Sequence, residues 1–180
     1  MTTIALIGFM GSGKTTIGQR LARSMEIPFV DTDDEIVNRV GMSIPEIFDH
    51  FGEQYFRGVE SEILKSLSKK ECVVATGGGI IKLDTNRQML RSNDFLTVWL
   101  DLTFDTVMKR IANDESRPLW NQDVEKRMSL FNSRQALYHD SSHFSVNVDG
   151  QPVEELIEEI KRYIYSYTMF GTKRQSDKNR

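Results

Sequence analysis

A glycine-rich segment near the start of the chain strongly limits the folds open to it. Residues 8–15 read GFMGSGKT, which has the spacing G-x-x-x-x-G-K-[ST]. The segment directly follows a short apolar run, Ile4–Ile7, and opens a stretch with helical periodicity. A strand that leads through such a loop into a helix is typical of a phosphate-binding loop (P-loop). The sequence therefore predicts an α/β fold with a nucleotide site at the end of its first strand.

The chemistry of this loop follows from its residue types. Its glycines let successive backbone N–H groups converge on an anion, and the helix N-terminus adds partial positive charge. Lys14 supplies a cation for the β- and γ-phosphates, so it is a catalytic candidate, and Thr15 offers a hydroxyl to Mg²⁺. The residues expected to contact ATP here are Gly11, Ser12, Gly13, Lys14, Thr15 and Thr16.

Apolar runs alternate with helix-period segments along the rest of the chain, which predicts a parallel sheet with helices on both faces. The expected strands are Ile4–Ile7, Pro28–Val30, Val73–Ala75, Phe95–Leu100 and Phe144–Val148. The expected helices are Lys14–Met25, Asp34–Val40, Ile44–Phe51, Tyr55–Lys69, Thr85–Arg91, Phe104–Ala112, Val124–His139 and Pro152 to about Tyr165. We expect one domain over residues 1–168, with a helical insertion at 34–68, an aperiodic polar stretch at 113–122, and a disordered tail at 169–180.

Size and charge narrow the function classes. A chain of 180 residues fits one globular domain, and a net charge of −3 gives no reason to expect nucleic acid or an anionic membrane as a partner. The single cysteine, Cys72, excludes an internal disulfide. No apolar run approaches the ~20 residues that cross a bilayer, and no targeting segment is visible. We expect a cytoplasmic protein, and a monomer by default.

Two carboxylates stand where the second expected strand ends. In Val30-Asp31-Thr32-Asp33, positions i and i+2 of a strand share a side, so Asp31 and Asp33 can face one site. One carboxylate can hold Mg²⁺ through its water, and the other can accept the proton of an attacking hydroxyl. The competing interpretation is that Asp33 and Asp34 only cap the helix that follows.

Four weaker signals occur further along the chain. Arg57 and Glu60 are three residues apart and share one helix face, which by itself indicates only a surface ion pair. Thr76–Gly79 places three glycines after the central strand, where a ligand can approach the backbone. Arg117 lies in the polar stretch and can close over a transferring phosphoryl group. Arg134 has the planar fork that suits a carboxylate.

Together these residues resemble the shikimate kinase family over about residues 2–165. The resemblance rests on the P-loop, Asp31-Thr32-Asp33, Gly52-Glu53 with Phe56-Arg57 and Glu60, Thr76–Gly79, Arg117-Pro118-Leu119, and Arg134 with Leu137-Tyr138. It implies a three-layer P-loop kinase fold with sheet order 2-3-1-4-5, as in nucleoside monophosphate kinases. It also implies transfer of the γ-phosphate of ATP to the 3-hydroxyl of shikimate, a step towards chorismate and the aromatic amino acids.

The resemblance also assigns roles. It places the shikimate carboxylate on Arg57 and Arg134, and the hydroxyls on Asp33 and the Gly78–Gly79 backbone, with Asp33 as the candidate base. Glu60 would orient Arg57, while Ile44, Phe48 and Phe56 would form an apolar wall. Thr15 and Asp31 would hold Mg²⁺. Residues 34–68 would form the shikimate-binding lobe and 113–122 the lid that carries Arg117. Arg110 and Gln151 are the candidates for the adenine side, which the sequence marks poorly.

Two other functions stay open at this point. A gluconate or nucleoside monophosphate kinase would have the same architecture, although the pairing of Asp33 with three glycines favours a polyhydroxy acid as acceptor. A non-catalytic relative would be expected to lack some of the catalytic and binding side chains. All five of the decisive ones are present: Lys14, Asp33, Arg57, Arg117 and Arg134.

Overall fold

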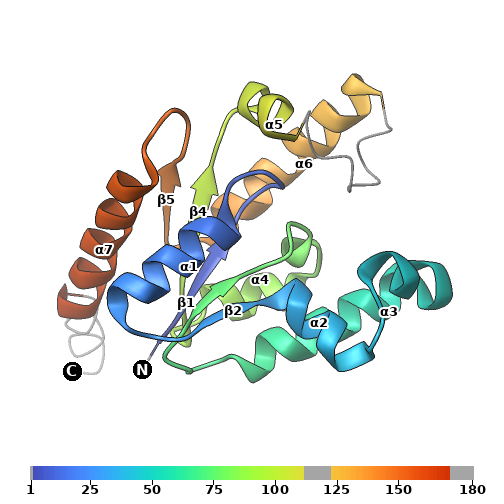
Figure 1. Ribbon diagram of the computed structural model, residues 1–180, viewed down its shortest axis with the longest axis horizontal. Helices are drawn as coiled ribbons and strands as arrows, with labels where there is room; N and C mark the ends of the chain where they lie inside the picture. Colours follow the sequence, from blue (N-terminus) through green and yellow to red (C-terminus); the bar gives the residue numbers. More distant parts are fainter. Residues whose placement is uncertain (1, 112–122, 171–180) are drawn as a thin grey trace, which may run out of the picture.

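A five-stranded parallel sheet forms the centre of the molecule (Figure 1). The computed structural model describes residues 2–111 and 123–170. The strands are β1 (Thr3–Ile7), β2 (Phe29–Asp31), β3 (Val73–Ala75), β4 (Phe95–Asp101) and β5 (Phe144–Asn147). Their order is β2-β3-β1-β4-β5, and Ile4 of β1 is in register with Val73 of β3 and Leu96 of β4. The predicted sheet order is confirmed.

Helices cover both faces of this sheet, as the alternating pattern predicts. In Figure 1, α1 crosses in front of the sheet and packs beside α7, while α4 and α6 lie behind it. The helices of the described ranges are α1 (Lys14–Met25), α2 (Thr32–Val40), α3 (Ile44–Ser66), α4 (Asp84–Arg91), α5 (Phe104–Ile111), α6 (Val124–Ser141) and α7 (Val153–Phe170), with a short 3₁₀ helix, η1 (Ile80–Lys82). The central strands are buried on both sides, which explains their almost purely apolar sequences.

The segment after β2 differs from the sequence prediction. Helix α2 begins at Thr32, two residues before the predicted start at Asp34. Its N-cap is Asp31, whose side chain accepts a hydrogen bond from the backbone N–H of Asp33. Asp31 is thus both the last residue of β2 and the N-cap of α2, so the chain passes from strand to helix without a loop.

Helix α3 joins two predicted helices into one bent element. The sequence predicts helices over 44–51 and 55–69, and the structure has Ile44–Ser66 with a kink at Gly52, whose φ of 77° and ψ of 173° are not helical. A φ in that region favours glycine over any residue with a Cβ. The kink changes the direction of α3 immediately before Glu53 and Arg57, so it determines where those side chains point.

The insertion formed by α2 and α3 has an apolar cluster of its own. The cluster consists of the buried side chains Ile36, Ile47, Phe56, Ile63, Leu67, Cys72 and Val74. A second, larger cluster fills the space between the sheet and the other helices. Cys72 is buried within the first cluster, as expected for a small apolar side chain. The insertion is thus a packed platform that extends from the edge of the sheet.

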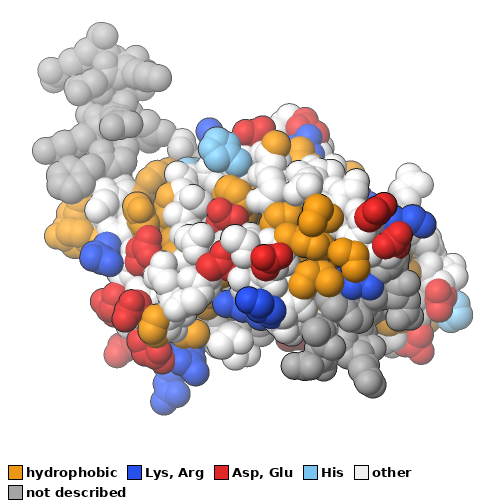
Figure 2. Space-filling view, turned by 90° about the horizontal axis from the view of Figure 1, so that it is seen from above, with side chains coloured by type: hydrophobic (Ala, Val, Ile, Leu, Met, Phe, Trp, Pro, Cys, Tyr) orange, Lys and Arg blue, Asp and Glu red, His pale blue; other side chains and the backbone are white. Residues whose placement is uncertain are grey.

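The remaining parts of the chain add two observations. Helix α7 continues to Phe170, five residues past its predicted end, and the rest of the predicted tail lies outside the described residues, as does the predicted lid. No helix of the described ranges is long and apolar enough to cross a membrane. Figure 2 shows acidic and basic side chains interspersed on one face, which agrees with the small net charge.

A histidine completes the pairing between β4 and β5. The backbone N–H of Thr97 donates to Nδ1 of His143 at 3.0 Å, and the backbone N–H of His143 donates to the carbonyl of Thr97 at 2.8 Å. Burial lowers the pKa of His143, and the nearby Arg91 guanidinium lowers it further. Nδ1 accepts this hydrogen bond only while it is unprotonated.

His143 is expected to make folding stability pH-dependent. Its folded pKa is depressed below the unfolded value near 6.5, so its full contribution is present above about pH 6.5 and is lost as the pH falls. Urea unfolding between pH 5 and 7.5 should show a steeper acid loss for wild type than for His143→Asn, which keeps an acceptor but does not titrate. His139→Asn, at an exposed histidine, is the matched control. Identical acid profiles for wild type and His143→Asn would contradict this role.

Candidate active site

The P-loop is held against the carboxyl end of the sheet. Gly8 has a φ of 150°, and a Cβ at this position would lie 2.7 Å from the carbonyl oxygen of Leu100 at the end of β4. Any other residue would push the loop away from β4. Within the loop, Nζ of Lys14 donates hydrogen bonds to the carbonyls of Gly8 at 2.9 Å and Phe9 at 3.0 Å. The cation is therefore held inside the loop that is expected to receive the phosphates.

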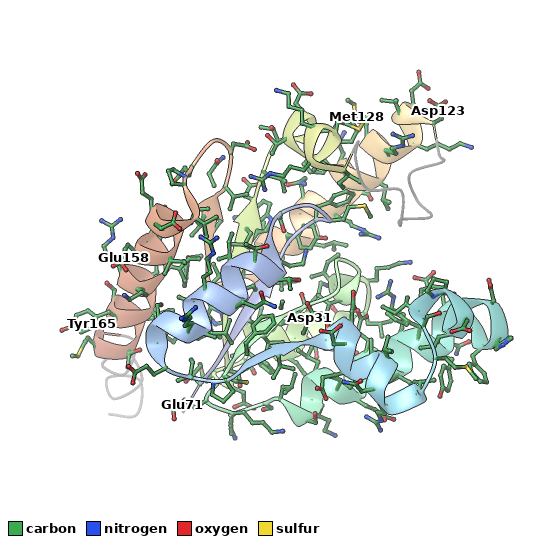
Figure 3. All side chains as sticks on the ribbon, in the orientation of Figure 1. Asp31, Glu71, Asp123, Met128, Glu158 and Tyr165 are labelled. Carbon is green, nitrogen blue, oxygen red and sulfur yellow. The ribbon has the colours of Figure 1, made fainter. Side chains whose placement is uncertain are left out.

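Thr15 and Asp31 form the predicted metal-binding pair. The hydroxyl of Thr15 donates to Oδ2 of Asp31 at 2.8 Å, which joins the first turn of α1 to the end of β2. In Figure 3, Asp31 lies at the end of β2, between α1 and α2. A hydroxyl oxygen beside a carboxylate oxygen is a suitable donor set for Mg²⁺, which binds few protein oxygens and keeps several waters.

The structure changes the reason why Asp31 and Asp33 share a site. The sequence argument placed both on one side of a strand, but only Asp31 is in β2, and Asp33 is in the first turn of α2. Asp31 provides the cap, so the proposed capping role of Asp33 and Asp34 is wrong. Thr32, between them, is fully buried, and its Oγ1 accepts a hydrogen bond from the backbone N–H of Gly77 at 3.0 Å. This bond ties the start of α2 to the triple-glycine loop.

These elements enclose a cleft of about 250 Å³ at the carboxyl ends of β1, β2 and β3. Its lining combines the P-loop and the first turn of α1 with both aspartates and the loop after β3. The lining residues are Met10, Gly11, Gly13, Lys14, Thr15, Thr16, Asp31, Asp33, Thr76, Gly77 and Gly78. The cleft lining contains two carboxylates, Asp31 and Asp33. If Asp31 binds the metal ion, Asp33 is the one that can bind the hydroxyl that receives the phosphoryl group.

Each of the first two glycines of the triple-glycine loop lies close to two functional side chains. A Cβ on Gly77 would lie 2.8 Å from Oδ1 of Asp33 and 2.9 Å from Oε1 of Glu60. The carbonyl oxygen of Gly78 accepts hydrogen bonds from the hydroxyl of Tyr138 at 2.6 Å and from Nη1 of Arg134 at 3.2 Å. A carboxylate pair and a hydroxyl–guanidinium pair therefore meet within two residues of backbone.

Arg57 covers the third glycine. A Cβ on Gly79 would lie 2.7 Å from Cζ of Arg57, so any other residue there would displace the guanidinium from this position. Nη1 of Arg57 donates to the fully buried Glu60 at 2.6 Å, and Nε donates to Glu53 at 3.2 Å. The guanidinium also lies 5.0 Å from the centroid of the Phe56 ring. These contacts hold the fork of Arg57 in one orientation beside the loop.

Glu53 also binds a second cation, at the same carboxylate oxygen that Arg57 contacts. Nζ of Lys82, in η1 just after the triple-glycine loop, lies 2.5 Å from Oε1 of Glu53. The ion pair links α3 to η1, so Glu53 connects the helix that carries Arg57 with the loop that Arg57 covers. Sequence reasoning missed Lys82, because the pair spans 29 residues and no local spacing indicates it.

The predicted apolar wall belongs to the core of the insertion. Phe56 is buried, its ring centroid lies 4.8 Å from that of Phe48, and Ile44 packs against the same cluster. None of the three lines the cleft described above. Phe56 is connected to the site by its contact with the Arg57 guanidinium. Contact of Ile44 and Phe48 with a substrate stays a prediction.

On the adenine side, the structure gives contacts but no test of the role. Arg110 donates from Nη1 to the carbonyl of Gly11 and from Nη2 to the carbonyl of Val148, both at 3.0 Å. It therefore joins α5, the P-loop and the segment before α7. Gln151 donates to the carbonyl of Asn147 at 2.9 Å. Arg117 lies outside the described residues, so its position over the phosphates stays a prediction.

Two further residues of the site had only a partial signal in the sequence. Tyr138 was part of the family pattern but had no role, and its place at Gly78 depends on α6 folding back over 60 residues. Thr32 lies between the two aspartates of the family pattern, and that pattern assigned it no role of its own. Both were invisible as functional residues because each acts on backbone groups.

Comparison with known proteins gives a consistent match. The family model described as shikimate kinase matches residues 10–165. The chain is 42% identical over 159 residues to the shikimate kinase of Aquifex aeolicus, a match that covers 87% of this chain and 92% of that one. It is 40% identical over 163 residues to the shikimate kinase of Enterococcus faecalis, with 89% and 96% covered.

Solved structures agree with the sequence matches. A shikimate kinase from Acinetobacter baumannii in complex with shikimate superposes with a TM-score of 0.85 at 33% identity, covering 92% of this chain and 94% of that one. The Aquifex aeolicus enzyme superposes with a TM-score of 0.81 at 39% identity, covering 93% and 98%. A sugar kinase from Janibacter, at 18% identity and a TM-score of 0.60, shares the fold alone.

The buried carboxyl of Glu60 leads to a prediction on pH. Burial raises its pKa to about 7, against the lowering effect of Arg57, and the nearby carboxylates of Asp33 and Glu53 raise it further. The folded protein therefore holds a proton between about pH 4.5 and 7 that the unfolded chain releases, so stability from this group falls as the pH rises through that window. Wild type should lose stability relative to Glu60→Gln between pH 4.5 and 7.5 in urea unfolding.

A matched control for this experiment lies on the same helix. Glu62 is an exposed carboxylate of α3 that pairs with Arg39 at 2.5 Å, so Glu62→Gln removes an equal charge from the solvent side. If the curves for wild type and Glu60→Gln stayed parallel across the pH range, Glu60 would not be the titrating group.

Proposed function

The chain belongs to the shikimate kinase family, and on that premise we propose which of its residues bind each substrate and carry the reaction. It is an ATP-dependent kinase that acts on shikimate and forms shikimate 3-phosphate and ADP, a step of aromatic amino-acid biosynthesis. One observation supports the residue assignment most directly. Arg57 and Arg134 reach the same triple-glycine loop, which borders the P-loop cleft.

The acceptor site is proposed to lie around this loop. Shikimate carries one carboxylate and three hydroxyls, so its site needs cations at one end and hydrogen-bond acceptors and donors at the other. Arg57 and Arg134 would bind the carboxylate through their forked guanidinium groups. The carboxylate of Asp33 and the backbone of Gly78–Gly79 would bind hydroxyls. Glu60 keeps the Arg57 guanidinium in position through the bond at 2.6 Å.

Phosphoryl transfer would then run across the cleft from the P-loop to Asp33. Asp33 accepts the proton of the 3-hydroxyl, the resulting oxygen forms a bond to the γ-phosphorus, and the bond from that phosphorus to the bridging oxygen of ADP breaks. Lys14 neutralises the negative charge on the phosphates. The cation would have to turn from the carbonyls of Gly8 and Phe9 to the incoming phosphates.

We include Mg²⁺ in the proposed site because the residues present fit it. Thr15 and Asp31 offer two oxygens on the phosphate side of the cleft. The two oxygens are already adjacent, because the Thr15 hydroxyl is hydrogen-bonded to Asp31. The ion would supply charge neutralisation for the β- and γ-phosphates. Function as a monomer in the cytoplasm, and the role of Arg117 as a catalytic residue of the lid, stay predictions.

The acceptor is tested by a screen of four compounds. ADP formation should be rapid with shikimate and close to the blank with gluconate, AMP and CMP. The blank is the Lys14→Met variant, which removes the phosphate-neutralising cation and should reduce turnover by orders of magnitude. Preferential turnover of gluconate or of a nucleotide would reject the proposed acceptor and keep only the P-loop kinase assignment.

The two-ended acceptor site predicts separate effects on the two substrates. Charge-assisted hydrogen bonds contribute roughly 1.5–3 kcal/mol each, so Arg57→Ala should weaken shikimate binding by on the order of tenfold to a hundredfold. ATP binding without shikimate should change little, because the P-loop lies across the cleft. Arg57→Lys should restore only part, since a point charge cannot reproduce the fork. Calorimetric titration of each ligand measures both affinities.

The matched control for Arg57 lies in the same insertion. Arg39→Ala also removes an arginine that pairs with a glutamate of α3, but Arg39 is exposed and joins α2 to Glu62. It should leave both affinities near wild type. A loss of ATP affinity in Arg57→Ala with unchanged shikimate affinity would mean that the two ends of the site are assigned the wrong way round.

A further inference from the structure

Tyr138 has a fully buried hydroxyl next to the proposed acceptor site. The side chain has no exposed surface and stacks on Trp99, with ring centroids 6.1 Å apart. Burying a hydroxyl costs free energy unless it is hydrogen-bonded, whereas a phenylalanine would fill nearly the same space without that cost. The hydroxyl therefore matters through its bond to the carbonyl of Gly78, at 2.6 Å.

That carbonyl controls the direction of a neighbouring N–H group. The described chain contains no cis peptide, so the peptide between Gly78 and Gly79 is trans and planar. A trans peptide directs its C=O and N–H to opposite sides. Because the Gly78 carbonyl is bound by α6, the N–H of Gly79 points away from α6. It is the backbone N–H next to the position that Arg57 covers.

Gly78 is also where the two loops of the site meet. A Cβ on Gly78 would lie 3.5 Å from the carbonyl oxygen of Gly8 and 3.6 Å from the backbone nitrogen of Met10, both in the P-loop. The same Cβ would lie 3.7 Å from the hydroxyl of Tyr138. Tyr138 therefore supports the acceptor loop at the point where it touches the loop that holds ATP.

Arg134 shares the carbonyl but has another proposed task. Its Nη1 donates to Gly78 at the longer distance of 3.2 Å, and its guanidinium is expected to bind the substrate carboxylate. When Arg134 turns to the substrate, the carbonyl loses one of its two donors. Tyr138 is fully buried and stacks on Trp99. Its hydroxyl donates to the Gly78 carbonyl and is itself hydrogen-bonded by the Arg134 side chain, so it stays on the peptide when Arg134 turns away.

We propose that Tyr138 is a positioning residue for shikimate, whose hydroxyl fixes the Gly78–Gly79 peptide so that the N–H of Gly79 faces the acceptor. The inference rests on the proposed function and adds a residue to it. It assigns Tyr138 no contact with either substrate and no part in proton transfer. A neutral hydrogen bond of this kind corresponds to about three- to tenfold in affinity.

The proposal is tested with Tyr138→Phe in the full chain. The KM for shikimate should rise about three- to tenfold, with the KM for ATP and kcat within about twofold of wild type. A merely structural tyrosine would not separate the two substrates. Equal changes in both KM values, or a fall in kcat alone, would overturn the proposal.

Thr97→Val is the matched control for the loss of a buried hydroxyl. The hydroxyl of Thr97 is also fully buried and also donates to a backbone carbonyl at 2.6 Å, that of Leu90 in α4, but neither residue lines the cleft. Urea unfolding of both variants shows whether they lose comparable stability. If Thr97→Val raised the KM for shikimate as much as Tyr138→Phe did, the effect would come from stability and the proposal would fail.

A second background separates Tyr138 from Arg134. If Tyr138 acts on the peptide, its loss should weaken shikimate binding at least as much in an Arg134→Ala protein, where it is the remaining donor to Gly78. If it acted only by holding Arg134, the effect would vanish there, and that result would overturn the proposal. Wild-type turnover of shikimate tests the function itself, while these ratios between variants test the inference, so the two failures are distinguishable.

Discussion

The adjacency of β1 and β3 is the constraint on which the rest of the site depends. Leu6 of β1 is in register with Ala75 of β3, so the two strands end side by side and release the P-loop and the triple-glycine loop into the same cleft. Parallel strands place both carboxyl ends at one edge, where ligands of open α/β sheets bind. Between the two loops the chain forms α1, β2 and the insertion that supplies Arg57 and Glu60 before it returns in β3.

Charge within the site is balanced locally rather than by the field of the whole protein. Arg57 is paired with Glu53 and Glu60, and Lys82 shares Glu53. Desolvating these charges is costly unless each has a partner, and the raised pKa of Glu60 shows that this cost is only partly compensated. The arrangement leaves Arg57 rigid and still cationic beside Gly79, which a carboxylate substrate requires. A net charge of −3 over the chain is compatible with two anionic substrates for this reason.

Much of this architecture was predictable because the P-loop and the strand periodicity are local signals. They gave the β1–P-loop–α1 unit, and the family resemblance gave the sheet order. The transition at Asp31 was not predictable from periodicity, since a residue at the end of a strand and at the N-cap of a helix obeys both patterns. The contacts of Lys82 and Tyr138 are long-range and depend on how α3 and α6 are placed against the loop after β3. Contacts between residues so far apart produce no regular spacing in the sequence from which they could be predicted.

The three glycines after β3 are constrained by neighbouring protein groups, a reason that sequence reasoning did not foresee. Sequence reasoning explained them by close approach of a ligand to the backbone. In the structure, the space beside Gly77 is taken by Asp33 and Glu60, and that beside Gly79 by Arg57. A Cβ at either position would force the ends of these side chains to move. Gly78 has ordinary contact distances of 3.5–3.7 Å, so its constraint comes from the P-loop and Tyr138 on either side. The side chains around the loop pack directly against its backbone to form the proposed acceptor site, and this close packing leaves little space for side chains on the loop itself.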